Sequence, residues 1–69
     1  MKKEPKLYKK HYTHVMLKTS EECNELAAEL LKAVNKGINK SSLKKVQEEV
    51  LDVKKQLKLL DVILDDFNK

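Results

Sequence analysis

The apolar residues in the second half of the chain recur at steps of three and four without interruption. The series consists of Leu43, Val46, Val50, Val53, Leu57, Leu60, Leu64 and Phe67. This spacing draws a single apolar stripe along an α-helix and does not fit the alternation of a half-buried β-strand. It predicts a helix over residues 43–67, about 37 Å long at 1.5 Å per residue.

A second apolar stripe precedes it, formed by Cys23, Leu26, Ala27, Leu30, Leu31 and Val34. Asn35, Lys36 and Gly37 end this stripe, and Gly37 suits the left-handed residue that follows many helices. The connection that follows is short and polar, and Ser41 or Ser42 is expected to cap the next helix. Two amphipathic helices joined by a short loop predict an antiparallel hairpin.

Residues 1–18 are predicted to form a basic arm or a short helix ahead of the hairpin at 19–69. Thr19 followed by Glu22 matches a capping box, which would start a new helix. The alternative is a helix that runs on from about Val15. Apolar and aromatic residues at helical spacing, with a proline in front, support a leading helix: Pro5, Leu7, Tyr8, His11, Tyr12 and Val15.

A chain of 69 residues is one small domain that buries only about 60% of its unfolded surface. It has a single cysteine, so it lacks an intrachain disulfide to compensate, and self-association is the expected source of stability. Leu59, Val62 and Ile63 widen the apolar face beyond what one partner helix covers. The sequence therefore predicts an all-α hairpin that assembles into a helical bundle, as a homodimer or homotetramer.

The net charge of +4 is concentrated at the N-terminus, where residues 1–20 carry six lysines and one acid. Such an arm could contact phosphates, but the chain has no arginine, the usual reader of guanine. A solvated arm is preferred to a nucleic-acid partner. With no apolar run of about 20 residues and no signal-peptide core, a cytoplasmic protein without a membrane partner is expected.

Acidic residues lie beside the apolar stripe of each helix. Glu22, Glu25 and Glu29 share one line on the first helix, and Glu49 and Asp52 lie on the second. Antiparallel packing would bring these lines together at the edge of the core, where carboxylates repel unless a cation lies among them. Oxygen ligands without imidazole or thiolate suit Mg²⁺ or Mn²⁺. The alternative is a solvated acidic face that forms ion pairs within each helix.

The segments EECNELAAELLKAVNKG and LKKVQEEVLDVKKQLKLLDVIL resemble the all-α nucleoside triphosphate pyrophosphohydrolases of the MazG type. The family pattern is ExxE on one helix and ExxD on the next, and here it reads Glu22-x-x-Glu25 and Glu49-x-x-Asp52. The resemblance covers about residues 15–65. Asn35 and Lys36 stand where many relatives have an arginine and an aromatic residue.

The resemblance implies a Mg²⁺- or Mn²⁺-dependent enzyme that hydrolyses a nucleoside triphosphate between its α and β phosphates, releasing the monophosphate and pyrophosphate. Glu22, Glu25, Glu49 and Asp52 would be the metal ligands and catalytic residues. Lys32, Lys36 and Lys45 would bind substrate, or would be ordinary solvated lysines. Relatives form four-helix bundles, so a two-helix chain implies a site completed by association. The alternative function is a non-catalytic interaction protein on this scaffold, binding a nucleotide or a protein.

Five further residues have specific expectations. Cys23 lies on the apolar stripe and is predicted to be buried rather than nucleophilic. His11 and His14 are expected at the surface rather than on a metal. Tyr8 and Tyr12 are expected to pack the arm against the hairpin, with base stacking as the alternative.

Overall fold

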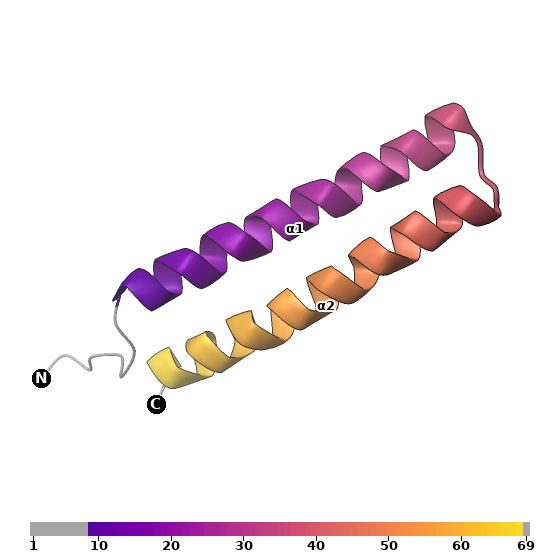
Figure 1. The fold of residues 1–69 in the computed structure, drawn as a ribbon. Coiled ribbons are helices and arrows are strands. Elements are labelled where there is room, and N and C mark those ends of the chain that lie inside the picture. Colours follow the sequence, from indigo (N-terminus) through magenta and orange to yellow (C-terminus); the bar gives the residue numbers. More distant parts are fainter. Residues whose placement is uncertain (1–8, 69) are drawn as a thin grey trace, which may run out of the picture.

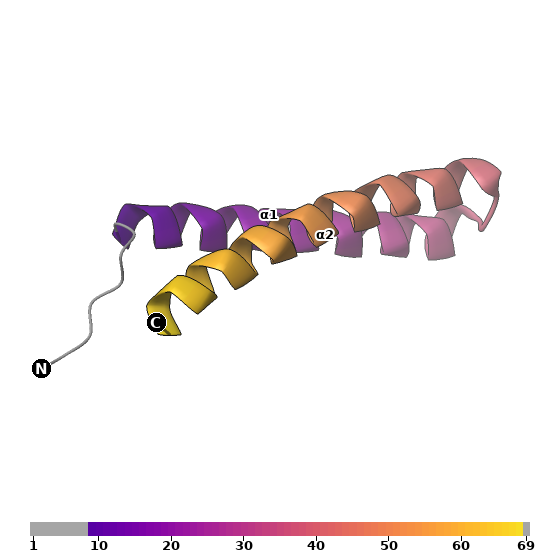
Figure 2. The same ribbon diagram turned by 90° about the horizontal axis from the view of Figure 1, so that it is seen from below.

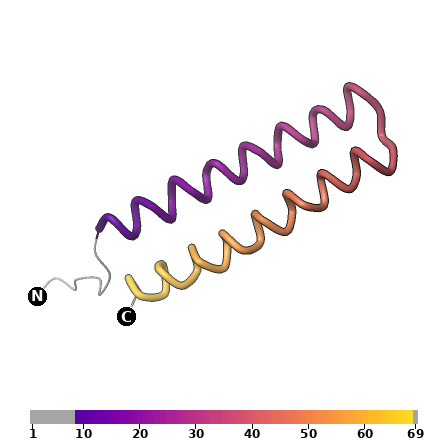
Figure 3. The backbone as a smooth tube through the Cα atoms, viewed as in Figure 1, coloured from indigo at the N-terminus to yellow at the C-terminus, as the bar shows by residue number. Residues whose placement is uncertain are grey.

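The protein is a hairpin of two long α-helices in a computed structural model that describes residues 9–68. Helix α1 spans Lys9–Lys36 and α2 spans Lys40–Asn68. They run antiparallel, so the start of α1 and the end of α2 lie at the same end of the hairpin (Figure 1). The tube trace in Figure 3 shows them side by side along their length, and Figure 2 shows that they cross at a shallow angle. The predicted all-α antiparallel hairpin is confirmed.

Helix α1 continues without a break through Thr19 and Ser20. Both hydroxyls donate back to carbonyl oxygens one turn earlier, Thr19 Oγ1 to Val15 at 2.7 Å and Ser20 Oγ to Met16 at 2.9 Å. These bonds satisfy the hydroxyls inside a helix instead of capping a new one. The run-on helix, already formed at Lys9, is therefore the alternative that the structure favours. Pro5, Leu7 and Tyr8 lie outside the described residues.

The turn between the helices is closed by Gly37 and Asn39. Gly37 has φ of 128° and its N–H donates to the Ala33 carbonyl at 3.1 Å, as expected after a helix end. Asn39 Oδ1 accepts from the Ser42 N–H at 2.9 Å, and Ser42 Oγ accepts from the Asn39 N–H at 3.0 Å. This reciprocal pair is a capping box. Asn39 is thus the cap, and the expectation that Ser41 or Ser42 would cap α2 is wrong because Ser42 lies three residues inside.

The helices meet along a seam, defined as the buried and half-buried positions that recur at steps of three and four. On α1 these are Tyr12, Val15, Thr19, Glu22, Leu26, Glu29 and Ala33; on α2 they are Ser42, Val46, Glu49, Val53, Gln56, Leu60 and Ile63. The repeat is that of a two-stranded coiled coil. Within residues 9–68 the buried apolar side chains are Ala33, Val53 and Ile63, so the seam is half polar.

The predicted apolar stripes do not form this seam as a whole. Leu26, Val46, Val53 and Leu60 do lie in it, but many members of both stripes are exposed: Cys23, Ala27, Leu30, Leu31, Val34, Leu43, Leu57, Leu64 and Phe67. The helices meet through a neighbouring line whose small residues, such as Thr19, Ala33 and Ser42, allow a close approach. Cys23 directly follows seam residue Glu22, so about 100° of helical rotation turns it out of the seam, and its predicted burial is wrong.

A hydrogen bond between Tyr12 and Asp66 joins the two helices at the open end of the hairpin. Tyr12 Oη donates to Asp66 Oδ2 at 2.8 Å. Burial, this hydrogen bond and the negative charge of Asp66 together raise the pKa of Tyr12 to about 12. Tyr12 therefore packs α1 against α2 as expected, and His11 and His14 are exposed as expected.

Neither helix, within the residues that the structure describes, has an apolar stretch of the length and purity needed to cross a membrane.

Candidate metal centre

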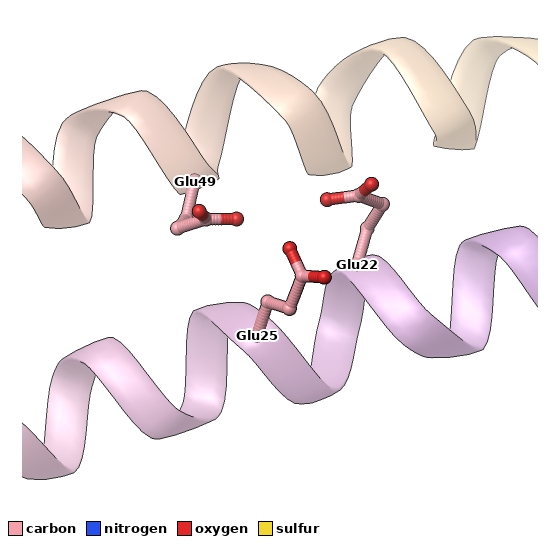
Figure 4. Close-up of side chains that lie close together, drawn as sticks. All are labelled: Glu22, Glu25 and Glu49. Atoms are coloured by element: carbon pink, nitrogen blue, oxygen red, sulfur yellow. The ribbon is translucent and has the colours of Figure 1, made fainter.

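Three glutamates from the two helices converge at the middle of the seam. Glu22 and Glu25 are one turn apart on α1, and Glu49 reaches them from α2 (Figure 4). One carboxylate oxygen from each lies within 4.8 Å of the other two. The antiparallel pairing places these residues together because the two acidic pairs lie at similar distances from the turn. Three of the four predicted ligands thus form one cluster within a single chain.

Two oxygens of this cluster are buried without a hydrogen-bond partner, Glu22 Oε1 and Glu49 Oε1. Glu22 is only 8% exposed, and its other oxygen, Oε2, lies 3.4 Å from Lys18 Nζ. Buried carboxylate oxygens ordinarily accept hydrogen bonds, because an unpaired polar atom away from water is costly. A cation is one kind of group that could pair with these two oxygens.

The environment of Glu49 is unfavourable for its negative charge. Burial raises the pKa of Glu49 above its ordinary value, and the charges of Glu25, Asp52 and Glu22, followed by a hydrogen bond with Glu25, raise it further. Asp52 lies outside the 4.8 Å cluster but still acts on it through its charge. A cation among the carboxylates would remove this repulsion.

The alternative, an ordinary solvated acidic face, fits Glu29 but does not fit the cluster of Glu22, Glu25 and Glu49. Glu29 Oε2 pairs with Lys32 Nζ at 3.4 Å, three residues away on the same helix. The cluster differs because its carboxylates come from two helices and face one another. Its donor set is oxygen only, with no histidine or cysteine in the described group, which fits Mg²⁺ or Mn²⁺.

Lys18 also adjoins the cluster, although it is not among the predicted site residues. Its Nζ lies 3.4 Å from Glu22 and 3.9 Å from Glu21. The spacing of four residues between Lys18 and Glu22 is the available signal, since residues four apart adjoin on a helix. Lys18 leaves Glu22 Oε1 free of partners, so it neutralises part of the cluster without filling it.

The three predicted substrate lysines gather around a pocket of about 250 Å³ beside the turn. Lys32 and Lys36 come from α1 and Lys45 from α2; the remaining lining residues are Glu29, Ala33, Gly37, Asn39, Ser41 and Ser42. Lys32 lies seven residues after Glu25, and Lys45 seven before Asp52, which is about 10 Å along each helix. A cationic pocket thus adjoins the acidic cluster on the same side of the hairpin.

Comparison of the chain with protein-family models, with curated proteins and with solved structures finds no match.

Proposed function

We propose that this protein is a Mg²⁺- or Mn²⁺-dependent nucleoside triphosphate pyrophosphohydrolase of the MazG type. The observation that supports the proposal most is the Glu22, Glu25 and Glu49 cluster, with its two buried, unpartnered oxygens. The same residues supply the ExxE and ExxD pattern of the sequence, with Asp52 as the fourth acid. Three residues of the sequence pattern, Glu22, Glu25 and Glu49, are thus also the members of the three-dimensional cluster.

The acids and the lysines have separate roles in this proposal. Glu22, Glu25, Glu49 and Asp52 hold the divalent ion. Bound there, the ion supplies neutralisation of phosphate charge and a more acidic water. The ammonium groups of Lys32, Lys36 and Lys45 bind the phosphate oxygens from the pocket about 10 Å away. The net reaction adds water across the bond between the α and β phosphates.

The test is a turnover assay with each ribonucleoside and deoxyribonucleoside triphosphate in Mg²⁺ or Mn²⁺. The expected result is equal amounts of monophosphate and pyrophosphate. Glu49→Gln should reduce turnover by more than about 100-fold, since losing even an indirect partner of a metal ligand costs 10–100-fold. Glu48→Gln is the matched control, because Glu48 is adjacent but exposed and outside the cluster.

Turnover that survives in Glu49→Gln, or that falls equally in Glu48→Gln, would contradict this assignment of the acids. Release of orthophosphate without pyrophosphate would contradict the position of bond cleavage.

The second candidate is a non-catalytic interaction protein on the same scaffold. The exposed apolar residues favour it, among them Leu59 at 49% and Val62 at 61% exposure. Such a protein would bind its partner equally well after Glu49→Gln and would need no divalent ion. Metal-dependent turnover distinguishes the two functions directly.

We also propose that the chain works as a homodimer or homotetramer, which would supply the stability that its small core lacks.

A further inference from the structure

The two edges of the hairpin have opposite chemistry. On each helix, the positions just before alternate seam residues (Tyr12, Thr19, Leu26 and Ala33 on α1; Val46, Val53 and Leu60 on α2) form one line. The charges of Glu25 and Asp52, one on each helix, both act on Glu49, and Lys32 and Lys45 line one pocket. These lines therefore share one edge, here named the charged edge: His11, Lys18, Glu25 and Lys32 of α1 with Lys45, Asp52 and the apolar Leu59 of α2.

The positions just after the other seam residues, Val15, Glu22 and Glu29 on α1 and Ser42, Glu49, Gln56 and Ile63 on α2, must then share the opposite edge. On α1 these are Met16, Cys23 and Leu30, and on α2 they are Leu43, Val50, Leu57 and Leu64. Each set recurs every seven residues, and neither contains a charge. We name this the apolar edge. Its large members stay between 40% exposed at Leu64 and 51% at Leu43, apart from the half-buried Val50.

We propose that the apolar edge is an isologous interface with a second copy of this chain, which leaves the charged edges and their acidic clusters on the outside of the dimer. A symmetric interface places the same surface on both sides. A surface that contained charges would oppose like charges to one another, whereas the uncharged apolar edge is complementary to itself. Both helices keep the seven-residue repeat that packs side chains between helices.

The small core of a single copy also supports a second one. Within residues 9–68 the buried apolar side chains are Ala33, Val53 and Ile63. No large side chain is fully buried among residues 9–68, so the dimer would supply the missing core.

One consequence concerns the acidic cluster. Glu22, Glu25 and Glu49 meet within one chain, and the apolar edge lies across the seam from Glu25 and Asp52. Each copy therefore carries its own cluster. The dimer is required for stability and does not supply ligands, in contrast to a site completed by association. It does not depend on the hydrolytic reaction.

The first test is the mass in solution, measured by light scattering after size exclusion. The full chain should have about twice the 8.0 kDa of one copy. Leu57→Lys, on the apolar edge, should weaken the dimer by about 30-fold or more, the effect of losing one strong interface contact. Leu51→Lys is the matched control, because Leu51 is comparably exposed, at 54% against 44%, but lies outside the edge.

The second test uses the native thiol of Cys23, so it does not depend on whether Leu57→Lys folds. Cys23 is exposed on the apolar edge, so its labelling by a maleimide should slow in proportion to the monomer fraction as protein concentration rises. A thiol moved off the edge, in Cys23→Ser with Leu51→Cys, should label at one rate throughout. A monomer at tens of micromolar would overturn the proposal. So would dissociation by Leu51→Lys alone, or protection of the thiol at position 51 instead of that at 23.

Discussion

The middle of the seam differs from its two ends in whether its polar side chains have hydrogen-bond partners. At the open end Tyr12 donates to Asp66 and Ile63 is only 4% exposed. At the turn Asn39 and Ser42 satisfy one another. In the middle, Glu22 and Glu49 bury oxygens with no partner. The ends hold the helices together, and the middle keeps a cluster of like charges whose repulsion the proposed cation would remove. A stable scaffold thus holds a site that costs stability.

The largest expected effect comes from emptying the core at the open end. Ile63→Ala should destabilise the protein by about 3 kcal/mol, the usual cost of truncating a buried isoleucine. Val62→Ala is the matched control and should change stability by less than about 0.5 kcal/mol, because Val62 is 61% exposed. Urea unfolding followed by circular dichroism measures both. Equal losses of stability in the two variants would mean that burial of Ile63 does not hold the open end of the hairpin together.

Adding the divalent cation should remove the destabilising repulsion among the carboxylates at the middle of the seam. Mg²⁺ or Mn²⁺ at 100 times its Kd should stabilise the native chain by about 2.7 kcal/mol, from mass action alone. The same ion should leave the melting temperature of Glu49→Gln nearly unchanged. Thermal melts with and without the ion, with Glu48→Gln as control, decide this. Stabilisation that persists in Glu49→Gln would place the ion elsewhere.

The hydrogen bond at the open end should contribute less. Tyr12→Phe removes the donor to Asp66 and should cost about 1 kcal/mol. A double-mutant cycle with Asp66→Ala, which removes the acceptor, isolates the pair from the other contacts of Asp66. A coupling energy near zero would show that packing of the ring, and not the hydrogen bond, holds this end.

The smallest effect is the pH dependence of the metal-free middle. Because the folded-state pKa of Glu49 is raised above 4.5, the folded chain binds more protons than the unfolded chain above that pH. Stability from this group is therefore lost as pH rises from 4.5 through the folded-state pKa. Glu49→Gln, which cannot ionise, should be more stable than the native chain at neutral pH, and the difference should vanish near pH 4.5. Melting temperatures in metal-free buffer measure it, and a difference that grows on acidification would refute it.

The sequence by itself determined the two helices, the turn at Gly37 and the antiparallel pairing. Each depends on local spacing: steps of three and four along each helix, a left-handed glycine at the end, and a loop too short for any other arrangement. Antiparallel pairing then brought the acids of the two helices to the same level, so the cluster of Glu22, Glu25 and Glu49 was also foreseeable. The sequence does not decide whether α1 runs on through Thr19 or starts there, because a capping-box pattern and an uninterrupted helix use the same residues.

Only the tertiary structure decided which stripe faces the partner helix. On each helix the seam is a mixed line and the predicted stripe is a more apolar line, and the two lines share residues such as Leu26 and Val53. Between the shared residues, the mixed line has acids such as Glu22 and Glu49. The apolar line has the next residue instead, Cys23 or Val50, about 100° away around the helix. Hydrophobicity favours burying the apolar line, and the sequence therefore predicts that this line faces the partner helix. The hairpin instead pairs through the mixed line, because helix contact depends on the side chains of both helices together, and small residues there permit close packing. The apolar line remains at the edge, where a second copy is proposed to cover it.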